Sequence, residues 1–263
     1  MNTAVKVSTF AKNVATAVII ISVVCYAENL KWISDSVIGL DMAENSVDDQ
    51  FIGCRDRMYK LITKKILPEE LKSNEDFKNI WEEYLNFTDN FTRIIKVYTD
   101  PSSDLYSQFN EAVSSGRRNY VRNFTYKAFH FLLTRAIQIH QVKKCTHVFR
   151  RTNVSFDTNV LGHEMRFGRF ASTSLRTNMS RIFGEISCFN VTTCFGANIA
   201  NISVLPEEEE VLIPPFEKFK ITNIEKNQMN CSVIYTLQST GTFSKMNCAL
   251  FNFKKMQMQM CGC

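Results

Sequence analysis

Hydrophobic spacing divides the chain into two halves. From residue 48 to residue 142, apolar side chains recur at intervals of three and four, the pattern of amphipathic helices. Two stretches show it most clearly: Phe77, Ile80, Trp81, Tyr84 and Leu85, and then Ala128, Phe129, Leu132, Leu133, Ala136 and Ile137. A Pro-Ser-Ser turn at residues 101–103 separates helical pieces. The first half is therefore predicted to be helical.

The second half, after Cys145, consists of short β-rich runs separated by Asn, Gly and Pro. The runs are THVFRR, RFGRFASTS, EISCFNVTT, EEEEVLIPP, EKFKITNIEK and CSVIYTLQS. In EKFKITNIEK, the apolar Phe219 and Ile221 alternate with lysines, as in a half-buried strand. Helices followed by strands predict an α+β fold with a largely antiparallel sheet. The sequence has no internal repeat and no low-complexity linker, which favours one domain.

The N-terminal residues indicate export. Lys6 and Lys12 precede an uncharged apolar run at residues 14–26, which is too short to span a bilayer comfortably. With the small residue Ala27, this pattern predicts a secretory signal peptide of residues 1–27. An uncleaved anchor or a buried helix is the alternative. Removing the two lysines lowers the formal charge from +5 to +3, an excess too mild to indicate a nucleic-acid partner.

The cysteines and glycosylation triplets agree with an extracellular protein. Eight cysteines follow residue 27: Cys54, Cys145, Cys188, Cys194, Cys231, Cys248, Cys261 and Cys263. An even number in an exported chain indicates disulfides, although spacing does not give their pairing. A metal site is the weaker alternative, because no Cys-x-x-Cys pair is present. Asn-x-Ser/Thr triplets begin at Asn86, Asn90, Asn123, Asn153, Asn178, Asn190, Asn201 and Asn230.

The C-terminal residues favour a soluble product over an anchored one. Residues 253–263 form a short polar tail without the apolar stretch of a lipid-anchor signal. We therefore expect a secreted protein with no membrane span in its mature form. Membrane association is the alternative.

The most conspicuous candidate for chemistry is a run of four glutamates at residues 207–210, bracketed by Pro206 and Pro214. Alone, such a run is usually a solvated surface patch. Here the apolar residues 211–213 follow at once, and if the segment is extended, Glu208 and Glu210 share one face. One carboxylate could stabilise an oxocarbenium-like transition state at a sugar carbon while the other prepares the nucleophile.

Two further elements could bind a ligand. In residues 166–174, Gly168 and Ala171 would let the backbone approach a ligand, and Ser172, Thr173 and Ser174 supply hydroxyl groups. An ordinary Ser/Thr-rich strand end is the alternative. Arg150 closes the run VFR and could hold a phosphate through paired hydrogen bonds, although a single such arginine is more often a surface cation.

Other chemistries lack their motifs. The sequence contains no Gly-x-Gly-x-x-Gly, no phosphate-binding Gly-x-x-x-x-Gly-Lys-Ser/Thr and no Gly-x-Ser-x-Gly. His163-Glu164 does not continue into a zinc-protease motif. We expect no metal.

In their order along the chain, these elements resemble the Arg–Ser–Glu-x-Glu signature of the ecto-mono-ADP-ribosyltransferases, vertebrate relatives of some bacterial toxins. The resemblance covers about residues 41–251. It includes DDQFIGC at 48–54, FHFLLTRA at 129–136, VFR at 148–150, RFGRFASTSL at 166–175 and EEEVLIPPFE at 208–217. It implies a catalytic domain over residues 28–252, with a helical part and two packed sheets lining an NAD cleft.

The resemblance also implies roles for the site residues, with NAD as co-substrate and arginine-containing proteins as acceptors. Arg150 would hold the NAD phosphates, and Ser172 would bind the nicotinamide ribose and help to place the glutamate. Glu210 would stabilise the ribosyl cation, and Glu208 would handle the acceptor arginine. Phe167 and Phe170 would help to form the nicotinamide pocket.

The resemblance further implies disulfides Cys54–Cys248 and Cys145–Cys194, which leaves Cys188 and Cys231 able to pair with each other. One departure concerns Arg151, which stands where many relatives have glycine.

Two alternatives to an arginine-directed transferase stay open. An NAD glycohydrolase would pass ADP-ribose to water, because the same cation reacts with either nucleophile. A catalytically silent secreted binding protein could keep the fold, but the intact Arg150, Ser172, Glu208 and Glu210 argue against it.

Overall fold

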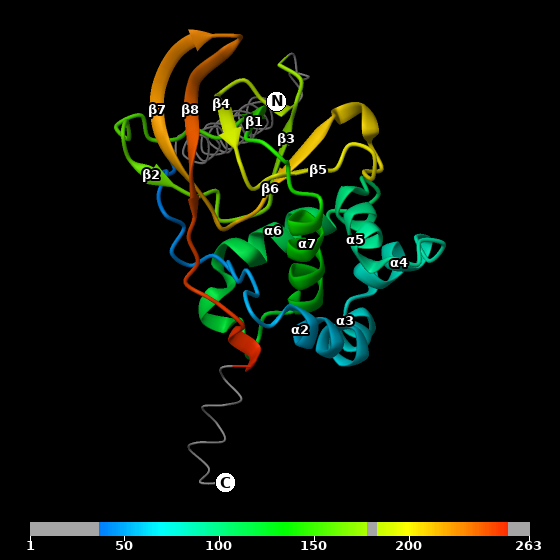
Figure 1. Ribbon diagram of the computed structural model, residues 1–263. Coiled ribbons are helices and arrows are strands. Elements are labelled where there is room, and N and C mark those ends of the chain that lie inside the picture. The colour runs from blue at the N-terminus through cyan, green and yellow to red at the C-terminus, as the bar shows by residue number, and fades with distance from the viewer. Residues whose placement is uncertain (1–36, 178–182, 252–263) are drawn as a thin grey trace, which may run out of the picture. The chain divides into compact units, whose positions relative to one another are not determined.

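The computed structural model describes residues 37–177 and 183–251 (Figure 1). Its contacts divide these residues into a small unit, residues 37–39 and 154–157, and a large unit with the rest. In the small unit, Ile38 and Phe156 form a parallel β-bridge. All elements below and the candidate site belong to the large unit. The predicted signal peptide and the polar tail lie outside the described residues.

The helices occupy the first part of the large unit, as predicted. They are α2 (Arg55–Leu61), a π-helical turn (Ile62–Ile66), α3 (Leu67–Ser73), α4 (Glu75–Glu83), α5 (Asn90–Thr99), α6 (Leu105–Ser115), a 3-10 turn (Gly116–Asn119) and α7 (Lys127–Ile139). Side-chain caps begin two of them: Asn74 accepts a hydrogen bond from the Phe77 N–H of α4, and Asp89 accepts from two N–H groups of α5. Such caps satisfy N–H groups that lack a partner within the helix.

The strands follow in the second part. They are β1 (Thr146–Thr152), β2 (Glu164–Met165), β3 (Ala171–Ser174), β4 (Ser187–Thr193), β5 (Ala197–Asn198), β6 (Glu210–Ile213), β7 (Glu217–Gln228) and β8 (Cys231–Thr242). In β7, Phe219 and Ile221 are fully buried while Lys220 is exposed, as the alternation predicted. The α+β fold is confirmed.

Hydrogen bonds join the strands in the order β2-β7-β8-β4-β1-β3-β6-β5. Neighbours are antiparallel except β4 and β8, which are parallel. The resemblance implied two sheets, but the described strands are hydrogen-bonded into one sheet. Within it, β1 and β3 are paired only through Phe149↔Ser174. The link divides the strands into a larger group that ends in β1 and a smaller group of β3, β6 and β5.

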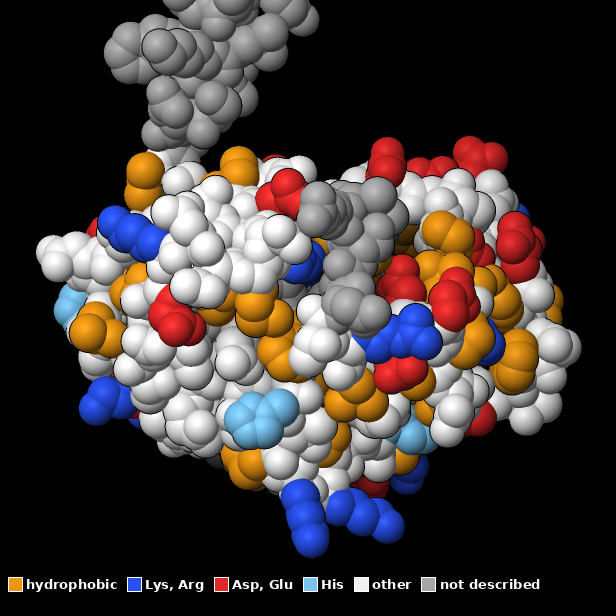
Figure 2. Space-filling model, turned by 90° about the horizontal axis from the view of Figure 1, so that it is seen from above, with side chains coloured by type: hydrophobic (Ala, Val, Ile, Leu, Met, Phe, Trp, Pro, Cys, Tyr) orange, Lys and Arg blue, Asp and Glu red, His pale blue; other side chains and the backbone are white. Residues whose placement is uncertain are grey.

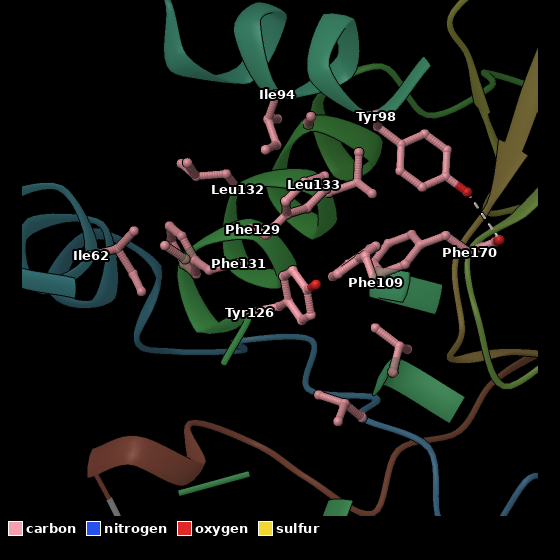
Figure 3. Packing of buried hydrophobic residues seen from close by; sticks show 14 of the residues in the cluster. Ile62, Ile94, Tyr98, Phe109, Tyr126, Phe129, Phe131, Leu132, Leu133 and Phe170 are labelled. Atoms are coloured by element: carbon pink, nitrogen blue, oxygen red, sulfur yellow. Dashed lines mark hydrogen bonds between the residues drawn. The ribbon is translucent and has the colours of Figure 1, made fainter. Parts of the chain in front are cut away.

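The main hydrophobic core lies among the helices and reaches the smaller strand group (Figure 3). The ring of Phe109 in α6 stacks on Phe129 of α7, with centroids 4.3 Å apart, and on Phe170, 5.4 Å away. All three rings are almost completely buried. Truncating such a side chain to alanine typically costs about 3–5 kcal/mol, so these contacts fix the smaller strand group against the helices.

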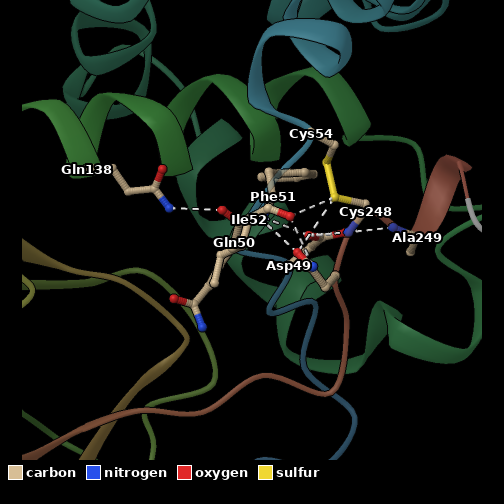
Figure 4. Close-up of a disulfide and its surroundings, with 9 residues drawn as sticks. Asp49, Gln50, Phe51, Ile52, Cys54, Gln138, Cys248 and Ala249 are labelled. Carbon is tan, nitrogen blue, oxygen red and sulfur yellow. Dashed lines mark hydrogen bonds between the residues drawn. A yellow bond between two sulfur atoms is a disulfide. The ribbon is translucent and has the colours of Figure 1, made fainter.

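Three disulfides are present among the described residues: Cys54–Cys248, Cys145–Cys194 and Cys188–Cys231. They are the pairs that the sequence analysis expected. The first joins residues 194 positions apart (Figure 4). Beside it, the Asp49 carboxylate accepts hydrogen bonds from the N–H groups of Phe51, Cys248 and Ala249. The disulfide and these hydrogen bonds therefore join residues 49–54 to residues 248–249, near the two ends of the domain.

A buried ion pair fastens the same region. Arg166 Nη1 lies 2.6 Å from Asp48 Oδ2, and both side chains are completely buried. The Asp48 carboxylate also accepts from the N–H groups of Lys245 and Met246. Removing one partner of such a pair leaves an uncompensated buried charge.

Candidate active site

The register of β3 and β6 brings three predicted side chains to one face. Ser174 lies opposite Glu210 in this antiparallel pair. Because residues two apart on a strand point to the same side, Ser172 shares that face. The Ser172 hydroxyl lies close enough to the Glu210 carboxyl to lower its pKa. From the neighbouring β1, the Arg150 Nη1 donates to the Ser172 carbonyl at 2.7 Å.

The glutamate run is not extended, which corrects one prediction. Pro206–Glu208 forms a 3-10 turn, and Glu209 adopts a left-handed conformation with φ +46° before β6 begins at Glu210. Proline at the start favours the turn, because its φ suits a helical first position and its missing N–H is not needed there. The face shared by Glu208 and Glu210 therefore does not arise from strand alternation.

A hydroxyl from β3 holds this turn in place. The Ser174 Oγ donates to the Glu208 carbonyl at 2.6 Å and accepts from the Arg176 N–H at 3.0 Å. Arg176 also pairs with the Glu209 carboxylate, with Nε and Oε1 2.9 Å apart. The fastened turn brings Glu208 to the same hollow as Glu210.

This hollow has a volume of about 50 Å³. The residues that line it are Arg150, Arg151, Ser172, Thr173, Ser174, Phe183, Glu208 and Glu210. A larger hollow of about 530 Å³ lies beside α3 and α7, but its buried carboxylate, Glu70, is used to accept from two backbone N–H groups of α7. Chemistry rather than size identifies the smaller hollow as the candidate site.

Glu210 has the electrostatics of a functional carboxyl group. It is 4% exposed, and its Oε1 has no hydrogen-bond partner within the described ranges. Burial raises its pKa to about 7, with a further increase from Glu208, while the Ser172 hydroxyl and Arg150 oppose the rise. A buried charged oxygen without a partner is costly. Such a cost is expected where the oxygen serves a ligand.

The other charged groups of the hollow complement Glu210. Burial lowers the pKa of Arg150, but a guanidinium stays protonated at neutral pH. Burial, helped by the adjacent Glu207, raises the pKa of Glu208. The hollow thus offers one cation and two carboxyl groups around the Ser172 hydroxyl.

Arg151 contacts backbone on the rim of the hollow. Its guanidinium donates to the Met229 carbonyl at 2.8 Å and to the Gly184 carbonyl at 3.4 Å. The departure from glycine therefore places a second cation beside Arg150, held by the turn between β7 and β8.

The structure does not bring Phe167 and Phe170 to this hollow. Phe170 is 2% exposed and packs in the core, and Phe167 packs edge-on against Phe189 and Phe219. Their contact with nicotinamide stays a prediction. Gly168 packs against Ala43 rather than beside an open surface. Its φ is +65°, and an added Cβ would lie 2.3 Å from the Ala43 Cβ. This close approach also explains why the predicted strand over residues 166–174 begins only at Ala171.

Sequence reasoning missed two aromatic residues. Phe183, 40% exposed, lines the hollow, and Tyr98 of α5 lies near Ser172, which influences its pKa. Phe183 lies in no recognisable motif, and Tyr98 reads as an ordinary core position of a helix. No local signal in the sequence distinguishes either one.

Neither a metal nor a membrane-spanning segment is indicated in the described part of the chain. Residues 37–177 and 183–251 contain no cluster of His, Cys, Asp or Glu that could hold a metal ion. In the same ranges, no helix combines the length and hydrophobicity needed to cross a bilayer. On the face drawn in Figure 2, Lys and Arg side chains are spread out rather than gathered in a stripe.

Comparison with known proteins places this chain in a family. The family model described as NAD:arginine ADP-ribosyltransferase matches residues 40–245, most of the chain. The chain belongs to this family. Ecto-ADP-ribosyltransferase 5 of Rattus norvegicus is 34% identical, over 88% of this chain and 83% of its own length. GPI-linked NAD(P)(+)–arginine ADP-ribosyltransferase 1 of Mus musculus is 33% identical, over 84% of this chain and 76% of its own length.

Solved structures of the family share the fold. The crystal structure of the eukaryotic mono-ADP-ribosyltransferase ART2.2 matches with a TM-score of 0.69 and 32% identity, over 80% of this chain and 98% of that one. A mutant of ART2.2 in complex with NAD matches with a TM-score of 0.67 and 29% identity over the same shares. The predicted membership of the ecto-mono-ADP-ribosyltransferase family is confirmed.

Proposed function

We propose that this chain is an extracellular mono-ADP-ribosyltransferase that moves ADP-ribose from NAD to arginine side chains of acceptor proteins and releases nicotinamide. One observation carries the proposal. Glu210 is buried with an unpartnered oxygen among the described residues, and it shares its hollow with Arg150, Ser172 and Glu208. They are the four residues to which the resemblance assigns the Arg–Ser–Glu-x-Glu signature of the family.

The residues suit the chemistry of this transfer. The bond between ribose C1 and the nicotinamide nitrogen breaks, and its electrons leave with nicotinamide. Glu210 would stabilise the positive charge that develops on the ribose, because a carboxylate in a buried site interacts strongly with such a charge. The Ser172 hydroxyl orients that carboxylate and can bind the ribose. Arg150, a buried cation, would bind the negatively charged diphosphate.

Glu208 would serve the second half of the reaction. A bond forms between ribose C1 and a nitrogen of the acceptor arginine, and that nitrogen loses a proton. A guanidinium is charged at neutral pH and therefore a poor nucleophile. Glu208 is less buried than Glu210, so it can reach an incoming guanidinium, bind it and accept its proton.

The transfer can be tested with labelled NAD and a small guanidine acceptor. We expect both nicotinamide release and labelled acceptor from the wild-type protein. Glu210→Gln should lower both by at least about 10²-fold, the typical effect of losing one group that stabilises developing charge. Glu208→Gln should lower transfer to the acceptor more than nicotinamide release. The matched control is Glu225→Gln, because Glu225 is exposed and does not line the hollow.

The outcomes separate the proposal from its alternatives. Free ADP-ribose as the sole product with every guanidine or protein acceptor would identify an NAD glycohydrolase. Absence of nicotinamide release would indicate a silent binding protein of the same fold. Equal losses of transfer and hydrolysis in Glu208→Gln would remove Glu208 from its role.

We further propose that the protein acts outside the cell in secreted form. Three disulfides support an oxidising compartment, and the printed names of relatives describe ecto-enzymes. Expression in animal cells followed by fractionation tests this. Recovery in the medium supports secretion, whereas recovery on membranes supports the alternative.

A further inference from the structure

Two buried polar side chains of the helical part hydrogen-bond the backbone of Phe170, just before the strand that carries Ser172. The Tyr98 hydroxyl of α5 donates to the Phe170 carbonyl at 3.2 Å (Figure 3). The Asn110 side chain of α6 accepts from the Phe170 N–H at 2.9 Å. Asn110 Nδ2 also donates to the Tyr98 hydroxyl, at 2.9 Å. The three residues form a closed ring of hydrogen bonds.

The ring fixes the backbone just before β3. Both backbone polar groups of Phe170 are satisfied by side chains of the helices, and the Phe170 ring stacks on Phe109. Phe170 stands two residues before Ser172. Tyr98 and Asn110 are 3% and 5% exposed, so water cannot easily replace either partner. The entry of β3 is therefore positioned by the helices and not by strand pairing alone.

The Tyr98 phenol also lies near Ser172 and Glu210, which both influence its pKa. Burial, together with Glu210, raises the pKa of Tyr98 above its ordinary range, while Asn110 and Ser172 oppose the rise. The phenol is consequently neutral at physiological pH. Its one proton goes to the Phe170 carbonyl, and its oxygen accepts from Asn110. Ser172 therefore lies near both the Tyr98 phenol and the Glu210 carboxyl.

We propose that Tyr98 and Asn110 are positioning residues for the transfer reaction, which hold the Ser172 hydroxyl against Glu210 through the backbone of Phe170. Neither residue lines the hollow, so neither is a catalytic residue. This inference rests on the proposed function, because it assigns Ser172 and Glu210 to the reacting site. Networks of buried side chains that lock a reacting group commonly determine how well it is placed.

The test compares two tyrosine-to-phenylalanine variants. Tyr98→Phe removes only the hydroxyl that joins Phe170 and Asn110. Tyr126→Phe is the matched control: Tyr126 is also buried against Phe109, but its hydroxyl contacts Gln108 at 3.4 Å and not the site. We expect Tyr98→Phe to lower kcat for nicotinamide release by about 10- to 100-fold, because small misplacements have effects of this size. KM for NAD should change less than about threefold, and Tyr126→Phe should match the wild type.

A double-mutant cycle distinguishes positioning from general support of the core. If Tyr98 acts through Ser172, adding Tyr98→Phe to Ser172→Ala should lower kcat by less than about threefold further. Independent contributions would multiply instead. Multiplying losses, or equal losses in Tyr98→Phe and Tyr126→Phe, would overturn the proposal.

A second variant keeps the test decisive if Tyr98→Phe does not fold. Asn110→Leu, of similar size, loses both the acceptor for the Phe170 N–H and the donor to Tyr98, and it should lower kcat with little change in KM for NAD. Unchanged kcat in this variant would overturn the proposal. A wild-type protein without nicotinamide release would refute the proposed function itself. An active wild type with unaffected Tyr98→Phe would refute only the positioning role.

Discussion

Replacing Glu210 with glutamine should stabilise the protein above neutral pH while it removes the activity. Glutamine has nearly the same shape as glutamate and can still accept from the Ser172 hydroxyl. Because glutamine carries no charge, its burial costs less free energy than burial of an ionised glutamate. The wild-type carboxyl is 4% exposed, with one oxygen unpartnered among the described residues. Its ionisation should therefore destabilise the folded state.

The pKa of Glu210 gives the magnitude. Burial raises it from the ordinary value of 4.5 to about 7. Between these two values the folded protein keeps a proton that the unfolded chain has released, so the free energy of unfolding falls as the pH rises. Each pH unit in this window corresponds to about 1.4 kcal/mol. The wild type should therefore lose about 3 kcal/mol by pH 8, a loss that Glu210→Gln avoids.

The assay is urea unfolding of both proteins at pH 5 and at pH 8. The stability gained by Glu210→Gln should be about 2–3 kcal/mol larger at pH 8 than at pH 5. Glu225→Gln, at an exposed position, is the control and should show nearly the same difference from wild type at both values. In the wild type, nicotinamide release should rise with pH up to about 7 and then level off, because the ionised carboxylate is the active form.

One outcome would refute this reasoning directly. If the stability difference between Glu210→Gln and the wild type is the same at pH 5 and pH 8, then the carboxyl titrates alike in the folded and unfolded states. Glu210 would then not be a buried carboxylate maintained at the expense of stability.

Three further predictions concern the supports of the site and of the domain. Ser174→Ala removes the hydroxyl that fastens the Glu208 turn, so transfer to a guanidine acceptor should fall several-fold more than nicotinamide release; a proportional fall would contradict this. Replacing Cys54 and Cys248 together by alanine should lower the free energy of unfolding by about 3–5 kcal/mol, measured by urea unfolding, because the disulfide closes most of the chain. Asp48→Ala leaves its buried arginine partner without a counter-charge and should cost about 3–5 kcal/mol in the same measurement; a loss below about 1 kcal/mol would show that water or another group compensates.

The broad architecture could be predicted because it depends on local periodicity. The spacing of apolar residues in α4 and α7, and the alternation in β7, reflect which side of each element is buried. The site required more. Ser172 and Glu210 were identified through the order of motifs along the chain, because a single hydroxyl or carboxylate has no local pattern that distinguishes it from a surface residue.

The Glu208 turn shows what strand alternation cannot predict. The shared face of Glu208 and Glu210 was expected from an extended chain, but it comes from a proline-initiated turn and the left-handed Glu209. That conformation depends on Ser174 and Arg176, which lie more than 30 positions earlier. Long-range hydrogen bonds of this kind leave no trace in local spacing.

The contact between Arg150 and the Ser172 carbonyl has a consequence for mutagenesis. The sheet narrows to one Cα pair between β1 and β3, and this 2.7 Å hydrogen bond is a side-chain bridge over the same narrow link. Arg150 therefore belongs to the framework as well as to the ligand-binding surface. Its replacement would loosen the junction between the two strand groups in addition to removing a cation, so the lost affinity for NAD would combine both effects. Only a comparison with Arg150→Lys, which keeps the charge but lacks the planar, forked donor, would separate recognition of the ligand from cohesion of the sheet.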